Sequence, residues 1–270
     1  MTFTVTAFYK FAVVQDPVQL RAELTAAGLD IGVKGTVLVA PEGINGTVSG
    51  SSEAIAALHA YLKNDPRFQE LETKESIAPT DPFRRFKVRL KREIVTFKQP
   101  DLDPVRDAGT YVRPEDWNAL IQDPDVVVVD TRNAYEIELG TFPGAVDPQT
   151  NYFSEFPAYV ERELESKRQR KIAMFCTGGI RCEKATAYLR AKGFSEVYHL
   201  QGGILKYLEV VPKVESLWQG ECFIFDSRVS LEHGFVRGRH RLCKRCGNTV
   251  RIDDEAAEPK TVLCAECSAL

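Results

Sequence analysis

One short segment, residues 171–194, constrains the fold more than any other, because three local patterns follow one another in it. Residues 172–175 are all apolar, which is typical of a buried parallel strand. Two adjacent glycines, Gly178 and Gly179, then turn the chain, and from Arg181 onward the apolar residues recur with a helical period. The sequence therefore predicts a strand, a tight loop and a helix in direct succession.

Cys176 closes this predicted strand and stands in the loop that leads to the helix. The first amides of a helix lack partners within the helix and lie at the positive end of its dipole, so they favour an anion such as a thiolate or persulfide. The same surroundings lower the pKa of a thiol, which makes Cys176 a candidate nucleophile. A buried cysteine that only packs at the strand end is the alternative interpretation.

Strands and helices alternate on both sides of this segment, over residues 111–214. Helices are expected near residues 114–120, 154–168 and 204–208, and further strands at residues 126–129 and 196–200. Alternation of this kind predicts an α/β domain in which helices cover both faces of a parallel sheet.

Residues 1–97 follow a different order of elements. Strands are expected at residues 3–11, 35–41 and 71–77, a strand within residues 41–50, and helices at residues 16–28 and 53–62. This order predicts an α+β domain of the ferredoxin-like or acylphosphatase-like type. The glycines of residues 41–50 could hold a phosphate, but a tight strand connection needs the same residues, and no P-loop pattern accompanies them.

A basic stretch closes this first domain. Its six basic residues are Arg84, Arg85, Lys87, Arg89, Lys91 and Arg92. Between residues 86 and 90 apolar and basic residues alternate, so in a strand the basic side chains would share one solvent face. Such a face could bind the phosphate backbone of RNA, or could simply protect an edge strand from pairing. With a net charge of −3 for the whole chain, any RNA contact must be local.

The two domains are joined by residues 98–110, which contain prolines and no periodicity and are predicted to be a linker. A C-terminal extension, residues 215–270, follows the second domain. It contains two Cys-x-x-Cys pairs, formed by Cys243, Cys246, Cys264 and Cys267. Four thiolates at this spacing can hold a structural zinc ion, which would supply folding energy to a short segment. Thiols without metal are the alternative.

The seven cysteines are an odd number, which fits reduced thiols better than a disulfide framework. The chain shows neither a signal peptide pattern nor an apolar run of membrane-spanning length. We therefore expect a cytoplasmic protein without a membrane partner. No flavin, haem or nucleotide motif is present, and the four histidines lack the spacing of metal ligands.

Residues 111–214 resemble the rhodanese family in several motifs that occur in the family's order. The matching segments are residues 130–132 with Glu136, residues 140–145, residues 176–181 and residues 200–204. Thr141 stands where the family commonly has a histidine. The resemblance implies a rhodanese fold in which Cys176 forms a persulfide, and in which Asp130 and Arg132 support the site as a buried pair.

The resemblance also implies roles for the rest of the loop. Arg181 ends the loop where it could stabilise an anion. The residues implied to form the anion-binding loop itself are Thr177, Gly178, Gly179 and Ile180. Cys182 follows directly and could resolve an oxidised or persulfidated Cys176, or could merely pack on the sheet.

Longer strings along nearly the whole chain are similar to the rhodanese-domain tRNA uridine hydroxylase family: APEGINGT, FCTGGIRCEKA, GGILKYLE and LWQGECFIFD. This resemblance implies an enzyme that uses molecular oxygen to make 5-hydroxyuridine at wobble position 34, with the tRNA anticodon loop as its partner. The sequence offers only the reactive Cys176 for oxygen chemistry, so hydroxylation through a persulfide or sulfenate on this residue is our hypothesis.

Two other functions remain open at this point. A sulfurtransferase would move sulfur from thiosulfate or a protein persulfide to a small acceptor. A noncatalytic scaffold would bind tRNA and sense redox state. The sequence does not identify a sulfur or electron donor protein.

Overall fold

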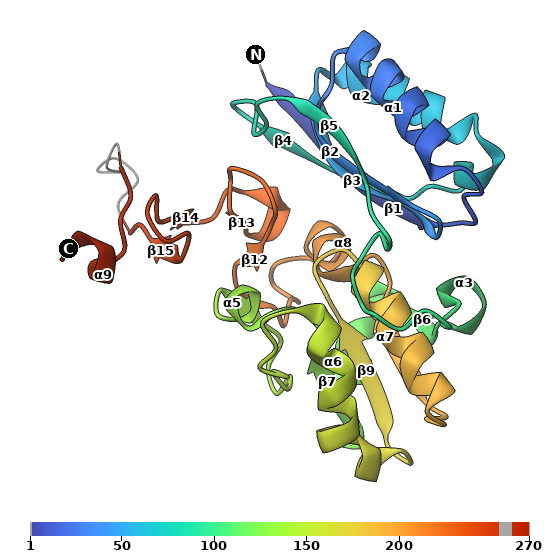
Figure 1. The fold of residues 1–270 in the computed structure, drawn as a ribbon. Coiled ribbons are helices and arrows are strands. Elements are labelled where there is room, and N and C mark those ends of the chain that lie inside the picture. Colours follow the sequence, from blue (N-terminus) through green and yellow to red (C-terminus); the bar gives the residue numbers. More distant parts are fainter. Residues whose placement is uncertain (1, 254–260, 270) are drawn as a thin grey trace.

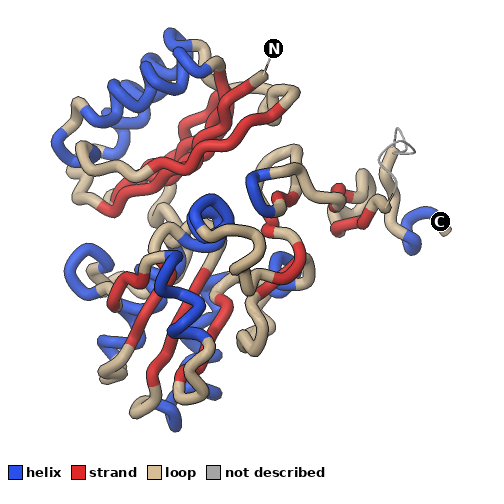
Figure 2. Tube along the Cα trace, turned by 180° about the vertical axis from the view of Figure 1, so that it is seen from behind, coloured by secondary structure: helices blue, strands red, loops and turns tan. Residues whose placement is uncertain are grey.

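The computed structural model describes residues 2–253 and 261–269, so residues 254–260 and 270 of the predicted extension lie outside the described residues (Figures 1 and 2). The N-terminal part is one sheet with the strand order β4-β1-β3-β2-β5. Its strands are β1 (Phe3–Phe11), β2 (Lys34–Ala40), β3 (Gly43–Gly50), β4 (Thr73–Ala78) and β5 (Phe86–Leu90). Strand β5 is parallel to β2, and the other neighbours are antiparallel.

Two helices, α1 (Pro17–Ile31) and α2 (Ser52–Lys63), cover one face of this sheet (Figure 1). Asp16 caps α1 by accepting a hydrogen bond from the amide of Gln19. The predicted end at Gly28 is wrong: α1 continues to Ile31, and Gly32 ends it in the left-handed conformation with φ 84°. Gly28 instead leaves room for the ring of Phe86 to pack against the helix.

The second domain is built on a four-stranded parallel sheet with the order β6-β10-β9-β7. Its strands are β6 (Thr110–Val112), β7 (Val126–Asp130), β9 (Lys171–Phe175) and β10 (Val197–Leu200). Helices α6 (Phe156–Tyr159) and α7 (Ile180–Ala191) pack on one face, and α4 (Pro114–Ile121) and α8 (Gly203–Val210) on the other. The predicted parallel sheet with helices on both faces is confirmed.

Two predicted segments differ in detail from the structure. The helix expected at residues 154–168 is broken into a 3-10 turn at Phe153–Glu155, α6, a π turn at Val160–Leu164 and a 3-10 turn at Glu165–Lys167. Val160 and Leu164, at the two ends of the π turn, are both fully buried. The expected linker contains a short helix, α3 (Pro104–Asp107). The domain boundaries themselves stay predictions.

The C-terminal part begins on the rhodanese-like domain and then leads away from it (Figure 1). Strand β11 (Gln219–Gly220) pairs with β8 (Gly140–Thr141), beyond the short helix α5 (Ala134–Ile137). Next come the hairpin strands β12 (Cys222–Phe223) and β13 (Ser230–Leu231), the turn His233–Phe235, β14 (His240–Leu242), β15 (Thr249–Arg251) and α9 (Ala265–Ser268). Within the described residues, no helix combines the length and apolar character needed to cross a membrane.

Candidate functional site

Cys176 lies at the carboxyl end of β9, and the loop after it leads into α7. Gly179 precedes α7 with φ 102°, a conformation that side-chain-bearing residues rarely adopt, and its amide donates a hydrogen bond to Cys176 Sγ at 3.1 Å. The first turn of α8 holds the loop in place, since the amide of Ile204 donates a hydrogen bond to the Cys176 carbonyl at 2.9 Å. The loop therefore holds a fully buried sulfur at a helix start.

The surroundings of Cys176 favour its thiolate. Burial by itself raises the pKa of this thiol, but hydrogen bonds from the side chain and amide of Cys182, the charge of Arg181 and the Gly179 amide lower the pKa to about 5. Burial and the charge on Cys176 raise the pKa of Cys182 well above its ordinary value. At neutral pH the pair is therefore one thiolate and one thiol that donates a hydrogen bond to it.

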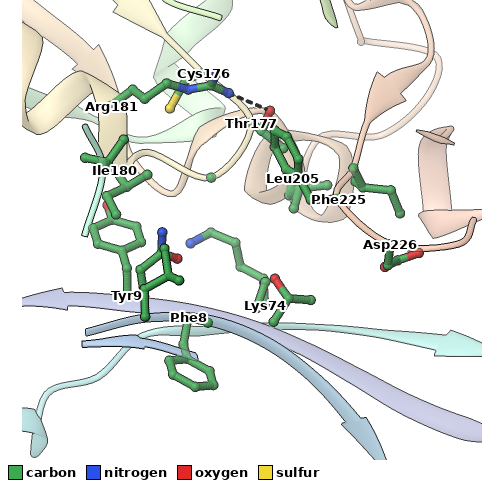
Figure 3. A pocket seen from close by; sticks show the side chains of 18 of the residues that line it. Phe8, Tyr9, Lys74, Cys176, Thr177, Ile180, Arg181, Leu205, Phe225 and Asp226 are labelled. Carbon is green, nitrogen blue, oxygen red and sulfur yellow. Dashed lines mark hydrogen bonds between the residues drawn. The ribbon is translucent and has the colours of Figure 1, made fainter. Parts of the chain in front are cut away.

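Arg181 is held by a carboxylate from the other side of the loop. Its Nη1 and Nη2 lie 2.6 and 2.8 Å from the two carboxylate oxygens of Glu136. Nη2 also donates to Thr177 Oγ1 at 3.2 Å, the bond that Figure 3 shows. Glu136 is fully buried. Arg181 thus ties the loop to α5, and its charge is already balanced before any ligand binds.

Asp130 and Arg132 form a buried ion pair one layer below. Arg132 Nη2 lies 2.6 Å from Asp130 Oδ2, and neither side chain is exposed. Thr141, which replaces the usual histidine, donates a hydrogen bond from its hydroxyl to Asp130 Oδ2 at 2.9 Å. The replacement therefore keeps a hydrogen bond to this carboxylate.

A pocket of about 890 Å³ opens in front of Cys176 (Figure 3). Its walls come from the loop, from the face of the N-terminal sheet that α1 and α2 leave uncovered, and from the segment around β12 and β13. Arg228 ties the third wall to the second, because its Nη1 donates to Ser76 Oγ of β4 at 2.8 Å. The aromatic residues that line the pocket with their rings are among Tyr9, Phe83, Tyr152, Phe153, Phe225 and Phe235, whereas the ring of Phe8 points away from it into the core below the sheet (Figure 3).

Comparisons with known proteins agree with this architecture. Residues 3–94 match the family model described as UPF0176 acylphosphatase like domain, and residues 113–209 match the Rhodanese-like domain. A protein of Rhizobium etli named tRNA uridine(34) hydroxylase is 54% identical over 268 residues, which are 98% of this chain and 86% of that protein. The chain belongs to the tRNA uridine(34) hydroxylase family.

A second member of the tRNA uridine(34) hydroxylase family, from Acaryochloris marina, is 52% identical over 256 residues, which are 95% of this chain and 83% of that protein. Among solved structures, a rhodanese-like domain from Anabaena is 19% identical and covers 41% of this chain and 78% of that one, with a TM-score of 0.34. The predicted family and the predicted order, an acylphosphatase-like domain and then a rhodanese domain, are confirmed.

The basic stretch of this hydroxylase family member forms the edge strand β5 and its flanks. Lys87 lies opposite Thr36 and Arg89 opposite Leu38, and both partners line the pocket. Side chains opposite one another in a sheet share a face, so Lys87 and Arg89 extend the uncovered face that roofs the pocket. The repulsion of Arg85 lowers the pKa of Lys87. Among the described residues, none forms an ion pair with the six basic side chains.

The four cysteines of the extension meet at one point and none of them lines the pocket. They belong to the segment of β14, β15 and α9, which lies apart from the two larger sheets (Figure 1). Their sulfur atoms all lie within 4.8 Å of one another, and Cys246 Sγ is 3.7 Å from Cys264 Sγ. A tetrahedral zinc site with Zn–S bonds of about 2.3 Å separates its sulfurs by about 3.8 Å. The donor set and its geometry therefore fit zinc.

Several residues at the site are missing from the candidates drawn from sequence. Tyr9 donates a hydrogen bond to Glu183 Oε1 at 2.7 Å, and burial raises the pKa of Glu183 to about 6. Lys184, which is 3% exposed, pairs with Glu42 at 2.8 Å and Glu93 at 2.7 Å and so joins the two domains. The sequence signal for Glu183 and Lys184 was their place directly after Cys182.

Proposed function

We propose that this chain is an oxygen-dependent tRNA hydroxylase, an oxidoreductase that places a hydroxyl group on C5 of the wobble uridine at position 34. The observation that carries the proposal is the Cys176 thiolate at the wall of a pocket of about 890 Å³, which can admit a nucleotide base. The names of the two relatives support this substrate and reaction.

The pocket suits a base from a single-stranded loop. Bases in RNA loops are unstacked and bind proteins by stacking on aromatic side chains, and several aromatic residues line this pocket. The basic face of β5 continues the roof outward, where the phosphates of an anticodon loop would pass. We therefore infer that the anticodon loop lies along β5 while uridine 34 enters the pocket.

Hydroxylation by oxygen needs two electrons and two protons besides the substrate, because one oxygen atom enters C5–H and the other leaves as water. Cys176 and Cys182 together hold two electrons, and they release them when their sulfurs join in a disulfide. We infer that this dithiol is the immediate reductant. In the overall reaction, uridine, oxygen and the two thiols give hydroxyuridine, water and one disulfide. An external thiol or donor protein must then reduce this disulfide.

Mass spectrometry of tRNA nucleosides tests the function and the electron source together. Reduced enzyme without added thiol should form about one 5-hydroxyuridine per chain under oxygen, together with a Cys176–Cys182 disulfide, and none under nitrogen. Added dithiothreitol should permit many turnovers. Equal product under nitrogen would contradict an oxygen-dependent reaction, and free Cys182 after one turnover would contradict the dithiol.

The same assay separates the alternative functions. A sulfurtransferase would turn over thiosulfate without RNA and form no hydroxyuridine. A noncatalytic scaffold would bind tRNA with an affinity that falls steeply with salt, again without product. We place the reaction in the cytoplasm with the tRNA pool, and recovery of the protein in another cell fraction would contradict this location.

Arg89→Ser should weaken tRNA binding and lower the slope of log affinity against log salt concentration by about 0.7, because one phosphate contact is lost. Lys63→Ser is the matched control, since Lys63 is also exposed but lies at the end of α2, behind the sheet. Filter binding over a salt series measures both variants. The same slope for Arg89→Ser and the wild type would remove Arg89 from the RNA surface.

We also propose that Cys243, Cys246, Cys264 and Cys267 bind one structural zinc ion. The convergence of the four sulfurs supports the proposal, as does the lowered pKa of Cys243, about 6, which amide hydrogen bonds from Cys246 and Cys264 produce. Metal analysis should find about one zinc per chain, and its removal by a chelator should unfold the extension. Four thiols that react freely in protein as purified would contradict a zinc site.

A further inference from the structure

Lys74 places a buried positive charge at the pocket wall opposite Cys176. It belongs to β4, where it pairs with Ala7 of β1, and its side chain runs from the sheet into the pocket toward Tyr9 and the cysteine loop (Figure 3). The residue is only 7% exposed, and its ammonium lies over the Tyr9 ring, 5.4 Å from the centroid. Tyr9 in turn lies against the loop: if Gly179 carried a Cβ atom, that atom would lie 2.7 Å from the Tyr9 hydroxyl.

Lys74 differs from the other buried cations of the pocket in forming no direct ion pair, although Glu72, the Cys176 thiolate and Glu183 are close enough to act on its charge. Arg181 is paired with Glu136, and Arg228 with Asp226 at 2.6 Å. Within residues 2–253 and 261–269, no hydrogen bond or ion pair to the Lys74 ammonium is formed. A buried charge without a partner is costly, and burial lowers the pKa of this ammonium. A molecule that enters the pocket can supply the direct partner that Lys74 lacks.

The chemistry of uracil beside a thiolate supplies such a partner. The C5=C6 double bond is conjugated with the C4 carbonyl, so the thiolate can add to C6. The S–C6 bond forms, the electron pair of the double bond moves to C5 and C4, and the charge appears on O4 as an enolate. A fixed ammonium near O4 binds this oxygen more tightly as the charge develops, which lowers the barrier.

We infer that Lys74 binds O4 of the target uracil and stabilises the enolate that forms when the Cys176 thiolate adds to C6. The inference rests on the proposed function, because it takes uridine as the substrate. It assigns a catalytic residue to the N-terminal domain, and it gives C5 the electron density that reaction with oxygen requires. The base would then lie between the rhodanese loop on one side and β1 and β4 on the other.

Exchange of the uridine C5 hydrogen with solvent tests the inference without oxygen. In heavy water the enolate takes a deuteron from the solvent at C5. When the original C5 hydrogen is then lost and Cys176 leaves C6, the deuterium stays in uridine. Wild-type enzyme and tRNA under nitrogen in heavy water should therefore deuterate uridine 34, as nucleoside mass spectrometry would detect. No exchange by an enzyme that hydroxylates tRNA would overturn the inference and leave the proposed function standing.

Lys74→Met should lower both the exchange rate and the maximal hydroxylation rate by about 100-fold, with little change in tRNA affinity. Lys74→Arg keeps the charge and should recover part of the rate, and Lys63→Met, an exposed change at the end of α2 behind the sheet, should behave as the wild type. Methionine removes an unpaired buried charge, so the melting temperature should not fall.

Two results would overturn the assignment. The first is wild-type exchange by Lys74→Met. The second is a loss that disappears as the pH is raised within the range in which Lys74 stays protonated, because Lys74 would then act only by lowering the pKa of Cys176. Alkylation of Cys176 by iodoacetamide across the same pH range separates these effects, and a loss that stays constant once Cys176 is fully ionised supports binding at O4.

Discussion

Replacing Cys176 by serine should reduce 5-hydroxyuridine formation at least about 1,000-fold, the scale of loss seen when a nucleophile is removed. The thiolate that Cys182, Arg181 and Gly179 stabilise has no counterpart in serine, whose hydroxyl stays protonated near neutral pH. Single-turnover incubation with tRNA and oxygen, followed by nucleoside mass spectrometry, measures the loss. Product within tenfold of the wild type would exclude Cys176 from the chemistry.

Two further cysteine variants serve as controls. Cys222 is also fully buried, but burial raises its pKa to about 12 and it does not line the pocket, so Cys222→Ala should keep the wild-type rate. Cys182→Ser retains the attacking thiolate but lacks the second thiol of the proposed reductant. It should exchange the C5 hydrogen under nitrogen yet need an added thiol for even a first hydroxylation.

The loop was predictable because everything that forms it is local. The apolar run of β9, the two glycines and the helical period after them lie within residues 171–194, and each follows from short-range rules of backbone conformation. The ion pair of Asp130 and Arg132 was implied by the resemblance to the rhodanese family. Local patterns thus located the candidate nucleophile, and the family resemblance indicated its supports.

The opposite wall of the pocket could not be predicted in this way. Tyr9 and Lys74 come from β1 and β4, 167 and 102 residues before Cys176. They meet the loop because the two domains dock through contacts such as those of Lys184 with Glu42 and Glu93. No local pattern encodes how two domains dock. The register of β5 against β2 was equally hidden, so the alternation of basic residues predicted a basic face but not its place beside the pocket.

Glu136→Gln should destabilise the rhodanese domain by about 3–5 kcal/mol, because it leaves the buried guanidinium of Arg181 without its counter-charge. The amide can still accept one hydrogen bond, but it cannot balance the charge. Both tryptophans of the chain, Trp117 and Trp218, lie in the core of this domain, so urea unfolding followed by tryptophan fluorescence reports on it specifically. Glu138→Gln, an exposed change two residues away, is the control.

The lowered pKa of Glu136 determines how the stability lost in Glu136→Gln changes with pH. Burial raises the pKa of Glu136, but Arg181 and the hydrogen bonds to the carboxylate outweigh burial and lower it. A carboxyl whose folded pKa is depressed stabilises the fold above its unfolded pKa and loses that contribution as the pH falls toward the folded value. The difference between wild type and Glu136→Gln should therefore be full at neutral pH and shrink on acidification. A difference that is independent of pH would mean that packing, and not the buried charge pair, holds the loop to α5.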